Sequence, residues 1–360
     1  MQIGLIGLQG SGKTKLFNTL AGIEETFEGK PRDNAVVEVV KVPDERLDKL
    51  TEIFNPKKKV NATIEVFDFP GLQTGDDGKV RLTNNFLQNV KNNDALFLIV
   101  RQFSNDAVPH PTGKIDPIAD VEFLLSEFLF ADLAFLENRI NRLRKDVMKS
   151  KDENLKRELP LIEKCYAHAE EEKPLRTLDL SESELKMLSG YQLLTLKPLA
   201  VAINFDETSL TNADELVKEA SEKFSEHEIT VIPFSAEIEY EMSQLDDEDR
   251  EMFMEEYGIK ESALDKILRT SYELLGLQSF FTVGEDECRA WTIKKNYTAQ
   301  QAAGVIHTDF YNKFIRAEVV HYDDFIKYGS FAKCKEAGVW RLEGKDYIVK
   351  DGDILNIRHN

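Results

Sequence analysis

The sequence predicts an α/β protein with a mostly parallel, doubly wound sheet, an inserted pair of long antiparallel helices, and a compact mixed α/β unit at the C-terminus. Three observations predict this fold. Apolar runs alternate with amphipathic helical patterns up to residue 100. Apolar residues then repeat at heptad spacing before the sheet resumes at Leu199, and a new series of short strand-like runs begins at Gln278.

The expected strands are continuous apolar runs, which is typical of strands that are buried on both faces of a parallel sheet. They lie at 3–8, 36–42, 62–67, 95–100, 199–203 and 229–234, and helical patterns at 13–20, 44–53 and 84–90 separate the first four. Strands that alternate with helices in this way indicate a mostly parallel, doubly wound sheet.

The inserted helices follow from two apolar series. Apolar residues from Leu125 to Val147 are spaced 4, 4, 3, 4, 3, 4, and those from Leu155 to Ala169 are spaced 4, 3, 4, 3. This heptad spacing predicts two antiparallel helices that join between 149 and 152. Pro160 removes a helix hydrogen bond, so we expect it to kink the second helix or delay its start. The pair is either a packing appendage or a partner-binding arm.

The domain boundaries follow from these patterns. We expect an α/β-sheet domain at 1–120 and 191–277, a helical insertion at 121–190, and a separate C-terminal domain at 278–360.

The charge balance excludes some partners. A formal net charge of −19 opposes broad capture of DNA or of an anionic membrane surface, because both are polyanions. The segment 278–360 is different, since it has 12 Lys and Arg against 12 Asp and Glu. It is therefore the region that we expect to contact RNA.

The cysteines and apolar runs indicate a cytoplasmic protein. Cys165, Cys288 and Cys334 are isolated and contain no C-x-x-C pair, which fits neither a disulfide framework nor a zinc site. The N-terminal run has no signal-peptide pattern, and the later apolar runs are too short to span a bilayer. A monomer is the default expectation.

A phosphate-binding motif lies between the first strand and the first helix. The stretch GLQGSGKT, residues 7–14, fits G-x-x-x-x-G-K-[ST] in the structural context that this motif requires. We expect Lys13 to bridge the β- and γ-phosphates and Thr14 to bind Mg²⁺. The loop residues expected to surround the phosphates are Gly7, Gly10, Ser11, Gly12, Lys13 and Thr14.

A second phosphate motif, D-x-x-G, follows the strand 62–67. It places Asp68 near the magnesium ion and the Gly71 amide near the γ-phosphate. The next residue is Leu72, where many related GTPases carry the glutamine that orients the attacking water. Because leucine cannot orient water, hydrolysis has to recruit another polar group or run slowly.

Further motifs resemble one family over essentially the whole chain. They are VPDERLDKL at 42–50, DFPGL at 68–72, VRQF at 100–103, HPTGKIDP at 110–117, NFDE at 204–207, and a dense series from RAWTI to KDGDI at 289–354. Together with the phosphate loop they resemble the Obg-like ATPases, the YchF family. The resemblance implies a G-protein-like P-loop NTPase domain, an inserted coiled-coil arm, and a C-terminal ubiquitin-like β-grasp (TGS) domain. It also implies ribosome or ribosomal RNA contact through the TGS domain and the arm.

The resemblance assigns residues to the base. Guanine-specific relatives carry N-K-x-D, whereas this family carries N-x-x-E, matched here by Asn204 and Glu207. A longer acid would crowd the guanine edge, and adenine has no 2-amino group to offer it. Phe205 could stack on either purine, and the backbone amides of Ser235 and Ala236 would contact the base. The expected nucleotide is ATP, with GTP as the alternative.

The resemblance also implicates His110, which matches a histidine in a mobile loop near the phosphates. It is a candidate catalytic residue that positions water in place of the missing glutamine. Without the resemblance, an isolated histidine in a proline-flanked loop is more often a surface residue.

Some positions depart from the family pattern. Gly10 stands where an asparagine is usual, so potassium-assisted hydrolysis is not expected. Arg32 replaces the switch I threonine, and Lys79, Arg81 and Thr83 replace switch II glycines. These departures make nucleotide binding more secure than turnover.

Three functions remain open. The first is a slow Mg²⁺-dependent ATPase that acts as a ribosome- or translation-associated molecular switch. The second is a GTPase of the Obg class, which the same phosphate residues would serve. The third is a nucleotide-gated ribosome-binding module with little or no turnover, which is compatible with the first.

Overall fold

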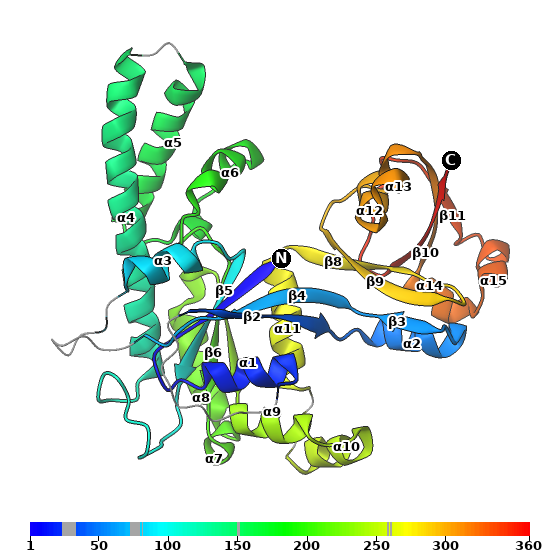
Figure 1. Ribbon diagram of the computed structural model, residues 1–360, viewed down its shortest axis with the longest axis horizontal. Helices are drawn as coiled ribbons and strands as arrows, with labels where there is room; N and C mark the ends of the chain where they lie inside the picture. Colours follow the sequence, from blue (N-terminus) through cyan, green and yellow to red (C-terminus); the bar gives the residue numbers. More distant parts are fainter. Residues whose placement is uncertain (24–33, 73–79, 81, 150–151, 258, 260) are drawn as a thin grey trace. The chain divides into compact units, whose positions relative to one another are not determined.

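The computed structural model describes residues 1–23, 34–72, 80, 82–149, 152–257, 259 and 261–360. The chain forms two compact units (Figure 1). The first contains Met1–Glu38 and Glu65–Leu264, and the second contains Val39–Ile64 and Asp265–Asn360. In the described part of the chain, no helix is long and apolar enough to cross a membrane.

The sheet of the first unit has the strand order β2-β4-β1-β5-β6-β7. β1 pairs in parallel with β4 and β5, and β5, β6 and β7 continue in parallel. Its strands are β1 (Gln2–Ile6), β2 (Val36–Val42), β4 (Ala62–Asp68), β5 (Ala95–Arg101), β6 (Leu199–Asn204) and β7 (Ile229–Phe234). Every expected strand is confirmed. Since parallel strands end at one edge, the residues that follow them gather there.

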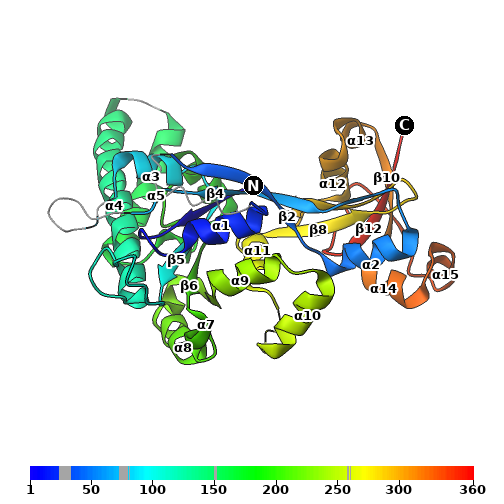
Figure 2. The same cartoon turned by 60° about the horizontal axis from the view of Figure 1, so that its bottom comes forward.

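Helices cover this sheet. α1 and α9 lie beside each other in both views (Figures 1 and 2). The helices of the first unit outside the arm are α1 (Lys13–Ala21), α3 (Asn84–Val90), α6 (Glu182–Leu188), α7 (Glu207–Leu210), α8 (Ala213–Lys223), α9 (Ala236–Ser243), α10 (Asp247–Glu256) and the start of α11 (Ala263–Leu274), with short 3₁₀ turns at Leu175–Thr177, Ser189–Tyr191 and Ser225–His227.

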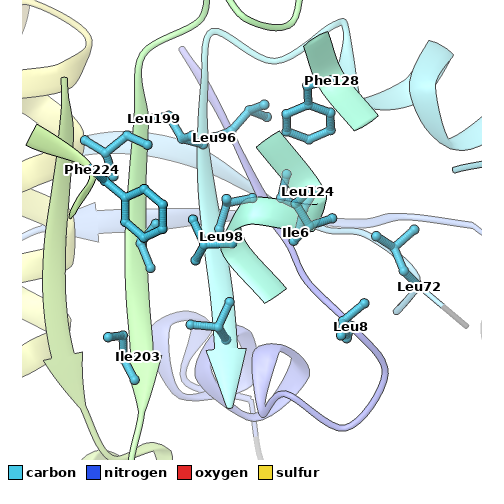
Figure 3. Close-up of a cluster of buried hydrophobic side chains, with 14 of the residues drawn as sticks. Ile6, Leu8, Leu72, Leu96, Leu98, Leu124, Phe128, Leu199, Ile203 and Phe224 are labelled. Atoms are coloured by element: carbon cyan, nitrogen blue, oxygen red, sulfur yellow. The ribbon is translucent and has the colours of Figure 1, made fainter. Parts of the chain in front are cut away.

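One core cluster of the first unit lies between the sheet and the start of the inserted helices. Figure 3 shows Leu96 and Leu98 of β5 and Leu199 of β6 among side chains that include Leu124 and Phe128 of α4. All residues of β5 are buried. This burial on both faces explains why its sequence is continuously apolar rather than alternating.

The inserted arm consists of α4 (Pro117–Lys149) and α5 (Glu153–Glu170), which run side by side away from the sheet (Figure 1). This confirms the expected helix pair and its junction. The expectation that Pro160 delays the start of α5 is wrong, because the helix begins at Glu153. Pro160 is exposed, while the neighbouring Leu161 and Ile162 are buried in the seam between the helices. That apolar contact holds the helix through the missing hydrogen bond.

The second unit has a mixed sheet with the strand order β11-β10-β12-β8-β9-β3. α12 packs against it, with Ala299 and Ala302 in one core with Phe280 and Val319. A helix across a mixed sheet agrees with the expected β-grasp fold. Besides most of α11, its elements include β3 (Lys58–Val60), β8 (Leu277–Thr282), β9 (Glu287–Lys294), α12 (Ala299–Ile306), α13 (Thr308–Asn312), β10 (Phe314–His321), α14 (Tyr322–Tyr328), α15 (Phe331–Glu336), β11 (Arg341–Glu343) and β12 (Asp353–His359).

A segment from the N-terminal third of the chain belongs to this second unit. α2 (Glu45–Phe54) stacks Phe54 on Phe325 with ring centroids 5.3 Å apart, and Arg46 forms an ion pair with Asp351 at 2.7 Å. β3 pairs in parallel with β9. The expected boundaries differ from this arrangement, since they assigned 39–64 and 265–277 to the nucleotide-binding domain. The local pattern of α2 shows an apolar face but not what covers it.

Candidate nucleotide-binding site

The phosphate loop connects β1 to α1 at the carboxyl edge of the sheet. Gly10 and Gly12 have φ angles of 77° and 89°, which glycine adopts most readily. A Cβ atom on Gly7 would lie 2.3 Å from the Ile99 carbonyl oxygen. No side chain caps the start of α1, so its first N–H groups remain open to an anion such as phosphate.

Asp68 joins the two residues that the sequence assigns to phosphate and metal. The Lys13 ammonium lies 2.5 Å from Asp68 Oδ1, and the Thr14 hydroxyl donates to Asp68 Oδ2 at 2.8 Å. Lys13 and Asp68 are both buried, with 5% and 4% of their surface exposed. Buried charges persist only when they are paired in this way, so the three side chains form one preorganised group.

Ser11 adds an unsatisfied polar atom to the loop. Its Oγ is buried and has no hydrogen-bond partner among the residues that the structure describes. A buried hydroxyl without a partner costs free energy, and in this position an oxygen of a bound phosphate could satisfy it.

The D-x-x-G segment is attached to the phosphate loop through its backbone. The Leu72 amide donates to the Gly7 carbonyl at 3.0 Å, and the Gln9 amide donates to the Leu72 carbonyl at 2.9 Å. A Cβ atom on Gly71 would lie 2.8 Å from Gln9 Cα, so only glycine fits there. The Leu72 side chain is buried in the core (Figure 3), which supports the prediction that this position does not orient water.

Asn204 ties three segments together at the end of β6. Its Nδ2 donates to the Ser11 carbonyl at 3.0 Å, and its Oδ1 accepts from the Ala236 amide at 3.0 Å. Asn204 Nδ2 carries a second hydrogen, which it could donate to a nitrogen atom of a purine. Ser235 is 1% exposed and caps α9 by accepting from the Ile238 amide.

Phe205 does not occupy an open position. It is 4% exposed, lies in the core of the first unit, and donates its backbone N–H to the Phe234 carbonyl at 2.8 Å. The expected stacking of its ring on a purine is therefore wrong for this structure. The half-buried ring at the same edge is Phe103, two residues after β5, which lies 4.5 Å from the Arg101 guanidinium.

The two acids after Asn204 have different roles. Asp206 Oδ1 accepts from the Thr208 hydroxyl at 2.7 Å and from the Ser209 amide at 2.8 Å, and so caps α7. These hydrogen bonds, led by that from Thr208, lower the pKa of Asp206. Glu207 is exposed. Asp206, the aspartate that could have bound guanine, is thus engaged in capping α7, whereas the Glu207 side chain is exposed.

Arg101 anchors the β5–α4 loop (residues 102–116) beside the phosphate loop. It is 2% exposed and donates to the carbonyls of Phe103, Asn105 and Val108 at 2.9, 3.3 and 2.8 Å. Burial lowers the pKa of its guanidinium. A Cβ atom on Gly10 would lie 2.8 Å from Val108 Cγ1, so this loop leaves no room for a side chain at residue 10.

His110 lies in the same loop but is not bonded to the phosphate residues. Its Nδ1 contacts the Thr112 hydroxyl at 2.9 Å, and its Nε2 contacts Asp120 Oδ2 at 3.1 Å, on the first turns of α4. Among the sequence-predicted residues, the structure joins Lys13 and Thr14 to Asp68, and Asn204 to Ser11 and Ala236. It brings His110 to Asp120 instead.

Thr14 and Asp68 suit magnesium better than they suit a metal ion that protein side chains alone would hold. In the described part of the chain, no group of three or more His, Cys, Asp or Glu side chains could hold a metal ion. A hydroxyl and a carboxylate at Thr14 and Asp68 match the few protein ligands that Mg²⁺ takes beside phosphate oxygens and water. The expected changes at Arg32, Lys79 and Arg81 lie outside the described residues.

Comparison with known proteins identifies the family. The model of the 50S ribosome-binding GTPase family matches residues 2–131, and that of the YchF-GTPase C-terminal domain, described as a protein of unknown function, matches residues 277–360. The ribosome-binding ATPase YchF of Bacillus subtilis is 42% identical over 99% of this chain and 98% of its own length. The chain belongs to the YchF family.

Further YchF proteins support this assignment. The ribosome-binding ATPase YchF of Pasteurella multocida is 43% identical over 99% of this chain and 98% of its own. A solved structure of the Schizosaccharomyces pombe YchF GTPase has a TM-score of 0.86 and 33% identity, and the match covers 99% of this chain and 97% of that one. The whole architecture is therefore that of a YchF protein.

Three residues of this YchF chain were missed by sequence reasoning. Arg101 and Phe103 stand in the quoted motif VRQF, where an arginine at the end of an apolar strand was a usable signal. Asp120 had no such signal, because an acid in the first turn of a helix is ordinary. Only its contact with His110 distinguishes it.

Proposed function

We propose that this chain is a slow, Mg²⁺-dependent ATPase that acts as a ribosome-associated molecular switch in the cytoplasm. The observation that carries this proposal is the convergence of Lys13 and Thr14 on Asp68 beside a glycine-rich loop. YchF relatives named as ribosome-binding ATPases support it. The buried free thiols of Cys165, Cys288 and Cys334 suit a reducing compartment.

The phosphate groups and the metal ion would bind at this convergence. Thr14 and Asp68 would hold Mg²⁺, which neutralises charge that develops on the transferred phosphoryl group. Lys13 would exchange part of its contact with Asp68 for the β- and γ-phosphates. The open N–H groups at the start of α1 and the Ser11 hydroxyl would complete the cradle.

Slow turnover follows from what surrounds the γ-phosphate position. Leu72 is buried in the core and its backbone is bonded to the phosphate loop, so this position provides no polar side chain. We assign the positioning of water to His110. In the structure both ring nitrogens of His110 are engaged elsewhere, so the β5–α4 loop has to rearrange before this residue can act.

Adenine is the proposed base. Asp206 is occupied by the cap of α7, so the carboxylate left for the base edge is that of Glu207. Asn204 would donate its second amide hydrogen to the purine. GTP stays as the alternative nucleotide, and the names of the relatives include both ATPase and GTPase.

Ribosomal RNA is the proposed macromolecular partner, and the tip of the arm supports it. In the described residues of 142–157, the exposed acids are Asp146, Asp152 and Glu153. The exposed cations in the same span are Arg142, Arg144, Lys145, Lys149, Lys156 and Arg157. This excess of positive charge within an acidic protein would favour a phosphate backbone. The charge-balanced C-terminal unit would be the second contact.

Nucleotide titration and single-turnover hydrolysis test the proposal. Purified protein should bind ATP more tightly than GTP when Mg²⁺ is present, and should release phosphate slowly. The Lys13→Ala variant should lose about 100-fold or more in the rate. Phosphate release equal to that of this variant would overturn the enzymatic claim.

Cosedimentation with ribosomes separates the switch from a simple enzyme. We expect ribosome binding to depend on the bound nucleotide. Binding without any turnover would favour the nucleotide-gated module. No binding in any nucleotide state would remove the ribosomal part of the proposal.

A further inference from the structure

The β5–α4 loop is attached at two points. Near its start, Arg101 donates to three of its carbonyl oxygens next to Gly10 of the phosphate loop. Near its end, His110 contacts Asp120 on α4. The loop therefore lies beside the phosphate loop at one end, while its histidine is held on a helix at the other.

The contact between His110 and Asp120 is sheltered. The two side chains are only 4% and 5% exposed, and Nε2 and Oδ2 lie 3.1 Å apart. The other ring nitrogen, Nδ1, lies 2.9 Å from Thr112 Oγ1. Because both nitrogens are engaged and the ring is covered, His110 has no polar atom left to bind a water molecule or a phosphate oxygen.

From this geometry we propose that Asp120 is a positioning residue that latches His110 onto α4 and thereby holds the β5–α4 loop in a conformation that does not hydrolyse nucleotide. This inference rests on the proposed role of His110 in hydrolysis. It goes beyond that role because it explains how turnover is restrained. Release of the latch frees the ring to reach the reacting phosphate.

The hydrogen bonds around the ring indicate where its proton lies. The Thr112 hydroxyl donates to the Lys114 carbonyl at 3.0 Å, and the Thr112 backbone N–H donates to His110 Nδ1 at 3.4 Å. A neutral imidazole that accepts at Nδ1 carries its proton on Nε2, which donates to Asp120 Oδ2. The pair is neutral while the carboxyl group of Asp120 is protonated.

The surrounding charges favour this neutral pair. Burial, followed by the charge of Asp116, raises the pKa of Asp120 to about 7. Burial and then the charge of Arg101 lower the pKa of His110. Asp116 itself forms an ion pair with Lys114, and the charges of Lys114 and of Lys223 on α8 help to lower its pKa. The pKa of Asp120 is raised because the carboxyl group is buried, and release into solvent lowers it again, so the latch weakens as the pH rises through about 7.

The first test measures the latch without hydrolysis. The reaction of His110 with diethyl pyrocarbonate is followed by mass spectrometry on the full chain. The Asp120→Ala variant should react about fivefold faster than the wild type, because the ring is released. Thr112→Val should give a smaller increase, and it remains informative if Asp120→Ala does not fold. The control is Asp106→Ala, an exposed acid of the same loop, which should react like the wild type. Equal reactivity in Asp120→Ala, Thr112→Val and the wild type would overturn the latch.

The second test measures hydrolysis at saturating ATP. Asp120→Ala should raise kcat about threefold to tenfold at about pH 6.5 without changing ATP affinity, and the gain should shrink at about pH 8. The gain should vanish in the His110→Ala background. A lower kcat in Asp120→Ala would instead make Asp120 an orienting partner of His110 and would overturn the latch. If the wild type shows no turnover while Asp120→Ala exposes His110, the ATPase proposal fails and the latch stands.

Discussion

The phosphate loop and the β5–α4 loop lie next to each other in the first unit, yet they are prepared for their roles to different degrees. At the phosphate loop, Lys13, Thr14 and Asp68 already touch one another. In the β5–α4 loop, His110 is bonded to Asp120 and Thr112 instead of to any phosphate residue. The groups proposed to bind nucleotide are in place, whereas the residue proposed to act in hydrolysis is held back.

This difference indicates that the β5–α4 loop, and not the phosphate loop, would control hydrolysis. A buried Lys13 needs a partner at all times, so Asp68 pairs with it until phosphate oxygens take over part of that contact. The His110 pair is neutral and so costs less to break. With the proposed latch, the protein would bind nucleotide readily and control when it is hydrolysed, which would suit a switch better than a fast enzyme.

The largest expected effect comes from a substitution at the phosphate loop and its partner Asp68. Asp68→Asn removes the carboxylate that pairs with Lys13 and that would bind the metal, so Mg²⁺-dependent ATP affinity should fall about 10- to 100-fold. Isothermal titration with and without Mg²⁺ measures this. The control is Glu65→Gln on the same strand, whose carboxylate bonds Gln2 and should leave affinity unchanged. Wild-type Mg²⁺ dependence in Asp68→Asn would contradict the assignment.

The next effect concerns the anchor of the β5–α4 loop. Arg101→Lys replaces a fork that reaches three carbonyls with a single ammonium, so the free energy of unfolding should fall by about 1 to 3 kcal/mol. Urea denaturation measures it. Arg144→Lys, on the exposed arm, should cost less than about 0.5 kcal/mol. Equal losses in the two variants would show that Arg101 is not an anchor.

The pH dependence of stability tests the contact between His110 and Asp120. The folded pKa of Asp120, about 7, lies above its ordinary value of 3.8, so its stabilising contribution is complete below about pH 4 and is lost as the pH rises to about 7. Relative to Asp120→Asn, the wild type should lose up to about 1.4 kcal/mol per pH unit in this window. Urea denaturation at several pH values measures the slope. Parallel profiles in the two proteins would mean that Asp120 is not protonated in the fold.

The smallest expected effect is on base choice. Glu207→Asp shortens the acid that would crowd guanine, so the ratio of GTP to ATP affinity should shift toward GTP by about threefold to tenfold. Competitive titration measures the ratio, with Glu215→Asp on the exposed face of α8 as the control. An unchanged ratio would place Glu207 away from the base.

Much of the site was predictable because it lies in contiguous motifs. A glycine-rich loop that follows a strand and ends in Lys13 and Thr14 defines a phosphate site within a short stretch of sequence. Asp68 lies at the end of another strand of the same parallel sheet. The parallel arrangement brings such strand ends together. The role of Phe205 was wrong because alternation along a strand end does not show which side of the edge a ring will face.

The sequence by itself determined the strands, the helix pair, the phosphate loop and the family, because periodicity and motif spacing act over short distances along the chain. Only the tertiary structure decided that α2 and β3 join the second unit, that Arg101 holds the β5–α4 loop, and that Asp120 holds His110. These outcomes depend on which buried surface or unpaired polar group a residue meets. Such encounters depend on packing between segments, and no local pattern encodes them.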